Sequence, residues 1–253
     1  MSVLFVAQWA TFGAEGINIV GKIPREIIYD QSLGEKRILF FLQLYFSVTR
    51  SSEIIVITND SITSMGYRPN TQKGRINDEF HAFVNNLVCR GYIKVITKNK
   101  NYTKYKSLSL MDEQSPFAII RYDEFNNIIT SASNKSTALL LLAFIRLNSY
   151  KRKSSKDRHP EIYFGYLSEI ANRLGVAIRS VSASLKHLSS LGILYGEEQR
   201  RFQDKHGNWH SGVYIFIDKV RYVNNIADQS YDWQSEFEQA SKWLKREQEK
   251  YIL

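Results

Sequence analysis

The 253-residue sequence has a single cysteine, Cys89, only four prolines, and no long hydrophobic run. One cysteine excludes a disulfide framework and any zinc site built from several thiolates. The longest apolar run, Ala138 to Ile145, is far shorter than the roughly 20 residues that a membrane-spanning helix needs. No Lys or Arg precedes the short apolar stretch at the N-terminus, so the pattern of a secretory signal is missing. We expect a reduced, cytoplasmic protein without a membrane segment, in which Cys89 is inert packing.

The sequence does contain enough apolar residues for a core, together with an excess of basic residues. Hydrophobic residues make up 43% of the chain, and 34 Lys and Arg stand against 25 Asp and Glu, a formal net charge of +9. The length fits one large domain or two of ordinary size. The charge favours an anionic partner but says nothing about the fold.

The same order of predicted elements occurs twice along the chain. It consists of an apolar helix, a short strand, a short helix, a turn, a longer helix and two strands around a polar tip. Glycines end the helices in both passes, as in Arg90-Gly91-Tyr92 and Leu191-Gly192-Ile193. We predict an α+β, mainly helical protein. The expected parts are an N-terminal strand or arm at 1–31, a first unit at 32–110, a connector at 111–133, a second unit at 134–220 and a C-terminal helix region at 221–253.

The second unit carries a resemblance to a known family. Its stretch LSEIANRLGVAIRSVSASLKHLSSLGIL, from Leu167 to Leu194, resembles the core of bacterial winged helix-turn-helix DNA-binding proteins, and the first unit is a looser match with an insertion. The resemblance implies two tandem winged-helix domains followed by a C-terminal amphipathic helix. At the level of domain arrangement, the chain is similar to plasmid and phage replication initiators and primosomal proteins.

The long helix of the second unit is the predicted base-reading element. Apolar residues at 178, 181, 185 and 188 form one helical stripe, which we expect to be buried. The outward face then presents Arg179, Ser180, Ser182, Ala183 and Lys186. Such a face can enter the major groove and present donors to base edges. The alternative is that the two serines only cap or solvate the helix.

The polar tips of both strand pairs are the predicted wings that contact the phosphate backbone. Segment 66–110 holds nine basic and two acidic residues, a net charge of +7. Lysine on an edge strand can also serve only to prevent aggregation. The candidate DNA-contacting residues outside the second long helix are Lys73, Arg75, Lys98, Lys100, Asn101, Lys104, Arg200, Arg201, Lys205, His206 and Trp209.

Two other basic or helical regions leave alternatives open. The outward face of the first long helix includes Asp78, Glu79 and His81 and is not especially basic, so the first unit either relies on its helix start and wing or serves dimerisation. The loop 151–158 either follows a phosphate backbone or is a solvated loop.

Signals for enzyme chemistry are weak. Gly16 to Lys22 has the spacing of a phosphate-binding loop, but Ile23 stands where a magnesium-binding Ser or Thr belongs. Asp204, His206 and His210 lack a fourth metal ligand. We expect no enzyme activity, no cofactor and no metal.

The tail predicts an amphipathic helix over about 230–251. Trp233, Phe237, Ala240 and Leu244 recur at spacings of four, three and four. The stripe either packs against the second unit or contacts a partner or a second copy. From these observations we predict a homodimer that binds specific double-stranded DNA at a plasmid or phage replication origin, where replication proteins could join it. The alternatives are a winged-helix transcriptional repressor and a protein-interaction or inhibitor module that does not bind DNA.

Overall fold

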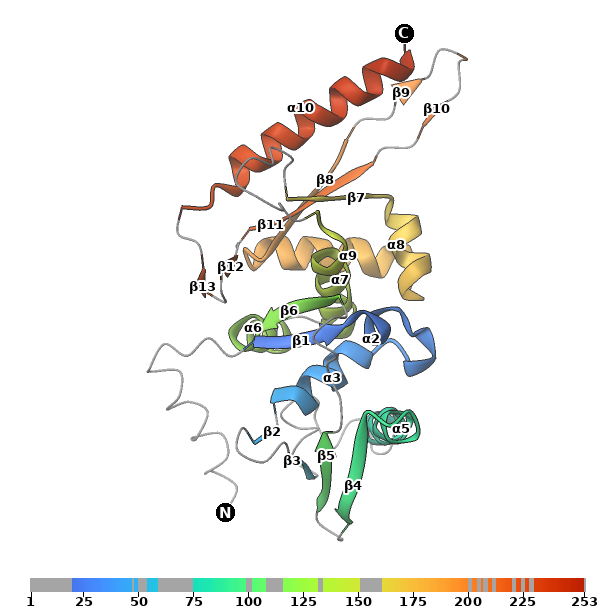
Figure 1. Ribbon diagram of the computed structural model, residues 1–253. Coiled ribbons are helices and arrows are strands. Elements are labelled where there is room, and N and C mark those ends of the chain that lie inside the picture. The colour runs from blue at the N-terminus through green and yellow to red at the C-terminus, as the bar shows by residue number, and fades with distance from the viewer. Residues whose placement is uncertain are drawn as a thin grey trace.

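The protein is α+β and mainly helical, and Figure 1 shows the order of its elements in the computed structural model. The structure describes residues 20–46, 48–49, 54–58, 75–98, 102–107, 116–131, 134–150, 161–199, 202–203, 206, 209–210, 213–219, 222–223, 226–227 and 230–252. The predicted fold class is therefore confirmed at this level.

The first half of the chain contains a four-stranded antiparallel sheet with the strand order β2-β3-β5-β4. The predicted strand 53–57 and the predicted strand pair after the long helix are present as β3, β4 and β5. The predicted short helix at 59–65 lies outside the described residues. The elements are β1 (Val20–Pro24), α2 (Arg25–Tyr29), η2 (Gln31–Leu33), α3 (Arg37–Phe46), β2 (Val48–Thr49), β3 (Ile54–Thr58), α5 (Arg75–Cys89), β4 (Ile93–Lys98) and β5 (Tyr102–Ser107).

The segment expected to be a connector contains regular structure that the sequence did not predict. β6 (Phe117–Arg121) pairs antiparallel with β1, and α6 (Tyr122–Ser131) follows directly. The backbone N–H of Arg121 donates to the Glu124 carboxylate at 3.0 Å, which satisfies a free donor at the start of α6. The N-terminal arm and the connector therefore form one two-stranded layer (Figure 1).

The second half repeats the predicted order around a three-stranded sheet. Its strand order is β7-β11-β8, all antiparallel, and α9 contacts α7, α8 and β8. The elements are α7 (Lys135–Asn148), β7 (Tyr163–Gly165), α8 (Leu167–Leu174), α9 (Ile178–Ser190), β8 (Leu194–Glu198), β9 (Phe202–Gln203), β10 (Trp209–His210), β11 (Tyr214–Asp218), β12 (Tyr222–Val223), β13 (Ile226–Ala227) and α10 (Trp233–Ile252).

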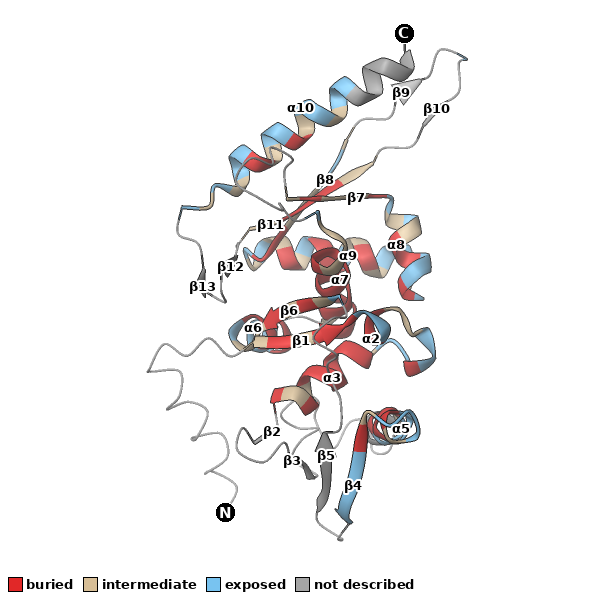
Figure 2. Cartoon of the chain, viewed as in Figure 1, coloured by how far each residue is buried: buried red, intermediate tan, exposed pale blue. Residues whose placement is uncertain are grey.

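Helix α7 is the centre of the hydrophobic core (Figure 2). The whole apolar run Ala138 to Ile145 has no exposed surface. α7 contacts α3 from the first half and α9 from the second, and one cluster of buried residues extends from Ile23 to Phe216. A core that continues through both halves favours a fixed relative orientation of the two halves.

The predicted ends of the long helices are confirmed. Gly91 and Gly192 follow α5 and α9 with φ values of 75° and 72°, a left-handed conformation that glycine adopts without a steric penalty. In both cases the next N–H donates back to the helix, from Tyr92 to Leu87 and from Ile193 to Leu188, each at 3.0 Å. The two helices therefore end in the same backbone motif.

The C-terminal helix α10 covers the outer face of the three-stranded sheet. Asp232 accepts hydrogen bonds from the backbone N–H groups of Gln234 and Ser235 at 3.1 Å each, which explains why the helix begins at Trp233. Ala240 is fully buried against Ile215 and Ile217 of β11. The predicted stripe of Trp233, Phe237, Ala240 and Leu244 thus packs against the second unit.

Candidate nucleic-acid interface

The turn between α8 and α9 consists of three residues, Gly175, Val176 and Ala177. Gly175 adopts φ 71°, and Val176 donates from its backbone N–H to Ala171 at 3.0 Å. Two helices joined by such a short glycine-containing turn are typical of a helix-turn-helix motif.

Side chains from the first half of the chain hold this turn. The Gln31 side-chain amide donates to the carbonyl oxygens of Asn172 and Arg173 at 2.9 and 3.1 Å. Arg37 donates to the carbonyl oxygen of Leu174 at 3.1 Å and twice to that of Ile28. The carbonyls of Asn172, Arg173 and Leu174 lie at the C-terminal end of α8, where the last carbonyl oxygens have no N–H donor within the helix. The turn is therefore anchored from outside its own unit.

Arg37 is an unusual buried cation. Burial lowers the pKa of its guanidinium to about 10, while the charges of Asp30 and Glu35 act in the opposite direction. Neither Gln31 nor Arg37 was predicted from the sequence to have a role. The signal that could have identified Arg37 is its position at the head of the apolar run ILFFL, where a solvated side chain has no place.

Helix α9 presents the predicted face to solvent. Arg179, Ala183 and Lys186 are exposed, while Ser180 and Ser182 are partly exposed. Val181, Ser184, Leu185 and Leu188 form the buried side. The residue before the helix is Ala177, whose side chain makes no capping hydrogen bond. The arrangement leaves hydroxyl and cationic groups of α9 available to a ligand.

One residue of the predicted buried stripe is exposed. Ile178 is 51% exposed, so the expectation that it belongs to the core is wrong. Val176, in the preceding turn, packs against the core instead. Helical spacing places residues 178 and 185 on similar sides of α9, but Leu185 is buried and Ile178, the first residue of the helix, is exposed.

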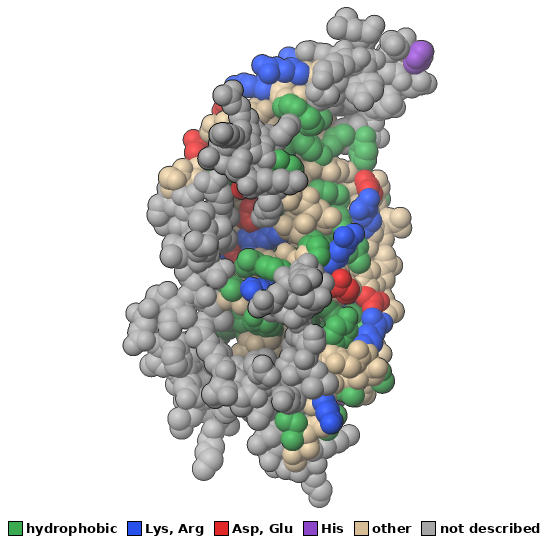
Figure 3. Space-filling view, viewed as in Figure 1, with side chains coloured by type: hydrophobic (Ala, Val, Ile, Leu, Met, Phe, Trp, Pro, Cys, Tyr) green, Lys and Arg blue, Asp and Glu red, His purple; other side chains and the backbone are tan. Residues whose placement is uncertain are grey.

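Two cations on α9 are not in ion pairs, unlike several other cations of the described structure. Within the described part of the chain, no carboxylate pairs with Arg179 or Lys186, and α9 itself contains no Asp or Glu. By contrast, Arg173 pairs with Glu169 at 2.6 Å, Arg90 pairs with Asp30, and Lys36 pairs with Glu79. Figure 3 shows basic and acidic side chains near one another along one side of the view. Paired cations offer little net charge to an anionic partner.

The remaining predicted contact residues fall into three groups. His206 is exposed. Arg75, Lys98, Lys104 and Trp209 are described as far as the backbone, in α5, β4, β5 and β10 respectively. Lys73, Lys100, Asn101, Arg200, Arg201 and Lys205 lie outside the described residues, as does the basic loop 151–158.

Both predicted strand pairs form antiparallel hairpins. Lys98 is paired with Thr103 in the first hairpin, and β8 is paired with β11 in the second, where Glu198 lies opposite Tyr214. The short strands β9 and β10 also pair with each other, with Trp209 opposite Gln203. The antiparallel pairing is therefore confirmed, but part of each predicted tip is strand: β5 begins at Tyr102, and β9 and β10 lie within 199–211.

The exposed face of α5 agrees with its predicted composition. Asp78, His81, Asn85 and Asn86 are exposed, and Phe80, Phe83, Val84 and Leu87 are buried. Cys89 is exposed, so the expectation that it is packed in the core is wrong. It is the last residue of α5.

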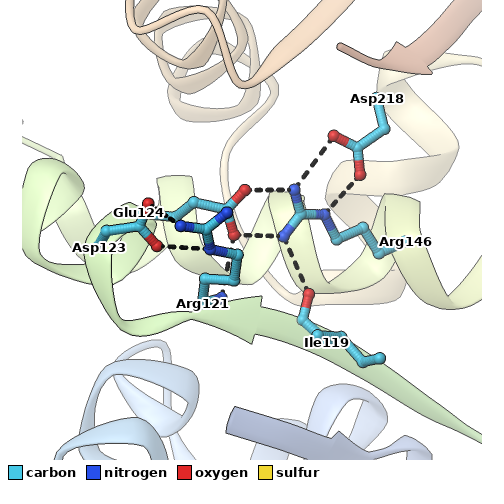
Figure 4. A network of polar contacts seen from close by, with 6 residues as sticks. All are labelled: Ile119, Arg121, Asp123, Glu124, Arg146 and Asp218. Carbon is cyan, nitrogen blue, oxygen red and sulfur yellow. Dashed lines mark hydrogen bonds and ion pairs between the residues drawn. The ribbon is translucent and has the colours of Figure 1, made fainter. Parts of the chain in front are cut away.

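A buried charge cluster joins the connector to the second unit (Figure 4). Arg146 of α7 makes two hydrogen bonds to Glu124 at 2.7 and 2.8 Å, two to Asp218 at 2.7 and 3.1 Å, and one to the carbonyl oxygen of Ile119 at 2.9 Å. Burial acts to lower the pKa of Arg146, but the charges of Asp218 and Glu124 outweigh it and raise the pKa above its usual value. The cluster fixes α6 and β11 relative to α7. The sequence signal was Arg146 itself, a lone charge in the apolar stretch STALLLLAFIRL.

Comparisons with known proteins identify no relative. No protein-family model, no curated protein and no solved structure matches the chain. Among the described residues, no helix has the length and apolar character needed to cross a bilayer, and no three His, Cys, Asp or Glu side chains gather as metal ligands would.

Proposed function

We propose that the chain is a sequence-specific double-stranded DNA-binding protein built from two tandem winged helix-turn-helix units. The observation that carries the proposal is the face of α9, which follows a three-residue turn and presents Arg179, Ser182 and Lys186 without any acidic neighbour on the helix. A recognition helix of this kind contacts base edges through its first turns.

The order of elements supports the proposal for the second unit. Helix α7, strand β7, helices α8 and α9 and the hairpin β8–β11 follow one another along the chain. The strand that comes last, β11, lies between the other two in the sheet. This is the arrangement that the resemblance to winged-helix proteins implies.

The first unit supports the proposal in a weaker form. Strands β3, β5 and β4 have the same order, with the last strand in the middle, and α5 precedes the hairpin as α9 does. The exposed face of α5 carries Asp78 and two asparagines, so this unit would contact DNA mainly through its basic hairpin or would serve dimerisation. We propose a plasmid or phage replication origin as the setting, on the resemblance of the tandem arrangement alone, with transcriptional repression as the alternative.

The first experiment selects bound duplexes from a random pool with the full chain and then measures affinity at 50 to 200 mM salt. Contacts to six or more phosphates should reduce affinity by about a thousandfold or more over this range. Failure to enrich any sequence, or a flat salt dependence, would contradict DNA binding and favour a protein-interaction module.

A pair of arginine variants tests which surface reads the bases. Arg179→Ala should weaken binding to the selected site by about 1–3 kcal/mol and should change binding to random duplexes far less. The matched control is Arg173→Ala, which removes an exposed arginine of α8 that is paired with Glu169. If both variants lose the same affinity on both kinds of DNA, α9 does not read bases.

A further inference from the structure

Ile178 is a large aliphatic side chain that the core does not use. It is the first residue of α9 and is 51% exposed, whereas Val181 and Leu188 of the same helix have no exposed surface. Val176 of the preceding turn packs against the core where the apolar spacing had placed Ile178. The core therefore packs without Ile178, and the fold leaves its side chain exposed.

The neighbours of Ile178 on the helix surface are the groups proposed to contact DNA. Residues 178, 182 and 186 are spaced by four and lie along one line of the helix, with residues 179 and 183 beside them. Arg179 and Lys186 supply positive charge, and the small side chain of Ala183 permits close approach of a ligand. The face thus combines one large apolar group with cations and a hydroxyl.

A DNA duplex offers a specific partner for such an apolar group. In the major groove the C5-methyl group of thymine projects beside the hydrogen-bonding atoms and is the apolar mark of an A·T pair. The first residues of a recognition helix are those that reach base edges. The cations on the same face complement the phosphates on either side of the groove.

From this juxtaposition we propose that Ile178 is a specificity-determining residue that recognises the 5-methyl group of a thymine. The inference rests on the proposed DNA-binding function. It adds that the start of α9 recognises a thymine and that the recognised group is the 5-methyl group.

The test uses a duplex selected by the full chain from a random pool. Each thymine of the selected site is replaced in turn by deoxyuridine, which removes only the methyl group. At one position the unsubstituted protein should lose about fourfold in affinity, the fold-change expected for one buried methyl group. The Ile178→Ala variant should bind the original site more weakly and should be insensitive to deoxyuridine at that same position.

The matched control is Ile96→Ala, which makes the same change at an isoleucine of β4 that is 50% exposed. Because β4 belongs to the basic hairpin, any affinity that this variant loses should be lost equally on the original and the deoxyuridine site, so it should keep the full deoxyuridine effect. Both variants should show the urea midpoint of the unsubstituted protein. A selected site at which no thymine methyl matters, or at which Ile178→Ala keeps the effect, overturns the role of Ile178 and leaves DNA binding in place. Failure to select any duplex overturns the proposed function, and this inference with it.

Discussion

Replacement of Arg146 by methionine tests how far the buried charge cluster stabilises the fold. Methionine fills a similar volume but removes all five hydrogen bonds that the guanidinium donates to Glu124, Asp218 and Ile119. The side chain of Glu124 is only 7% exposed and that of Asp218 is 23% exposed. The variant therefore removes the Arg146 cation from two carboxylates, one of them almost completely buried.

The expected loss follows from this burial. Breaking a buried ion pair by removal of one partner costs about 3–5 kcal/mol, because the remaining charge stays desolvated. This is a large part of the roughly 5–15 kcal/mol by which a domain is stable. The Arg121 backbone N–H still donates to Glu124 at 3.0 Å, which places the expected loss near the lower end of the range.

The assay is urea unfolding at pH 7, monitored by tryptophan fluorescence and by far-ultraviolet circular dichroism. Two of the four tryptophans, Trp233 and Trp243, lie on α10, which packs on β11. The control is Arg173→Met, the same substitution at an exposed arginine whose partner Glu169 lies four residues away on α8. A pair of this kind contributes about 0.3–0.5 kcal/mol. Adding Glu124→Gln to Arg146→Met removes the negative charge of Glu124 and should recover part of the lost free energy of unfolding. A double-mutant cycle measures that part.

The pH dependence gives a second check. A buried carboxylate without its cation takes up a proton more readily than it does in the unfolded chain. The folded variant then binds more protons than the unfolded one as the pH falls, so its free energy of unfolding should approach that of the unsubstituted protein from pH 7 towards pH 5. A loss below about 1 kcal/mol, or one equal to that of Arg173→Met, would show that the cluster does not stabilise the fold in this way.

Two further predictions concern the outer face of the second sheet. Ala240→Asp places a charge at a fully buried site of α10 and should cost about 3 kcal/mol or more and make α10 sensitive to protease, whereas Gln239→Asp, at an exposed neighbouring position, should do neither. Equal protease sensitivity of the two variants would contradict the docking of α10. The hydrogen bond from Tyr195 to Glu197 raises the pKa of Tyr195 to about 12, and burial contributes as the second cause. The unfolded chain loses the Tyr195 proton near pH 10, and the folded chain loses it only near pH 12. The hydrogen bond therefore stabilises the fold below pH 10, and this contribution is lost as the pH rises to 12. Tyr195→Phe should lessen the fall in urea midpoint between about pH 10 and pH 12.

Patterns within single elements were enough to predict much of the fold. The helical spacing at Phe80, Phe83, Val84 and Leu87 and the stripe on α10 each describe one element and the side it buries, and the structure confirms both. The glycines after α5 and α9 likewise mark helix ends through a conformation that depends only on the local backbone. These features follow from local chemistry, which a sequence displays directly.

Contacts between distant segments could not be predicted in the same way. β1 pairs with β6 across about a hundred residues, and no periodicity in either strand specifies its partner. Gln31 lies 141 positions before Asn172, whose carbonyl oxygen it contacts. Arg146 stood out as a charge among leucines, but only the fold brings Glu124 and Asp218 to it.

Ile178 shows why such a failure of local reasoning is informative. Helical spacing predicts which side of α9 a residue faces, but burial also needs a neighbouring element at that height: Val181 is fully buried, whereas Ile178, at the very start of the helix, is 51% exposed. Natural sequences depart from patterns that favour folding mainly where function requires it. A serine or lysine at position 178 would have solvated this turn, and the proposal that Ile178 meets an apolar group of a ligand starts from that difference. The exposure of Cys89, the other residue whose burial was wrongly predicted, carries no such argument, because it is the last residue of α5 and not the start of a proposed recognition helix.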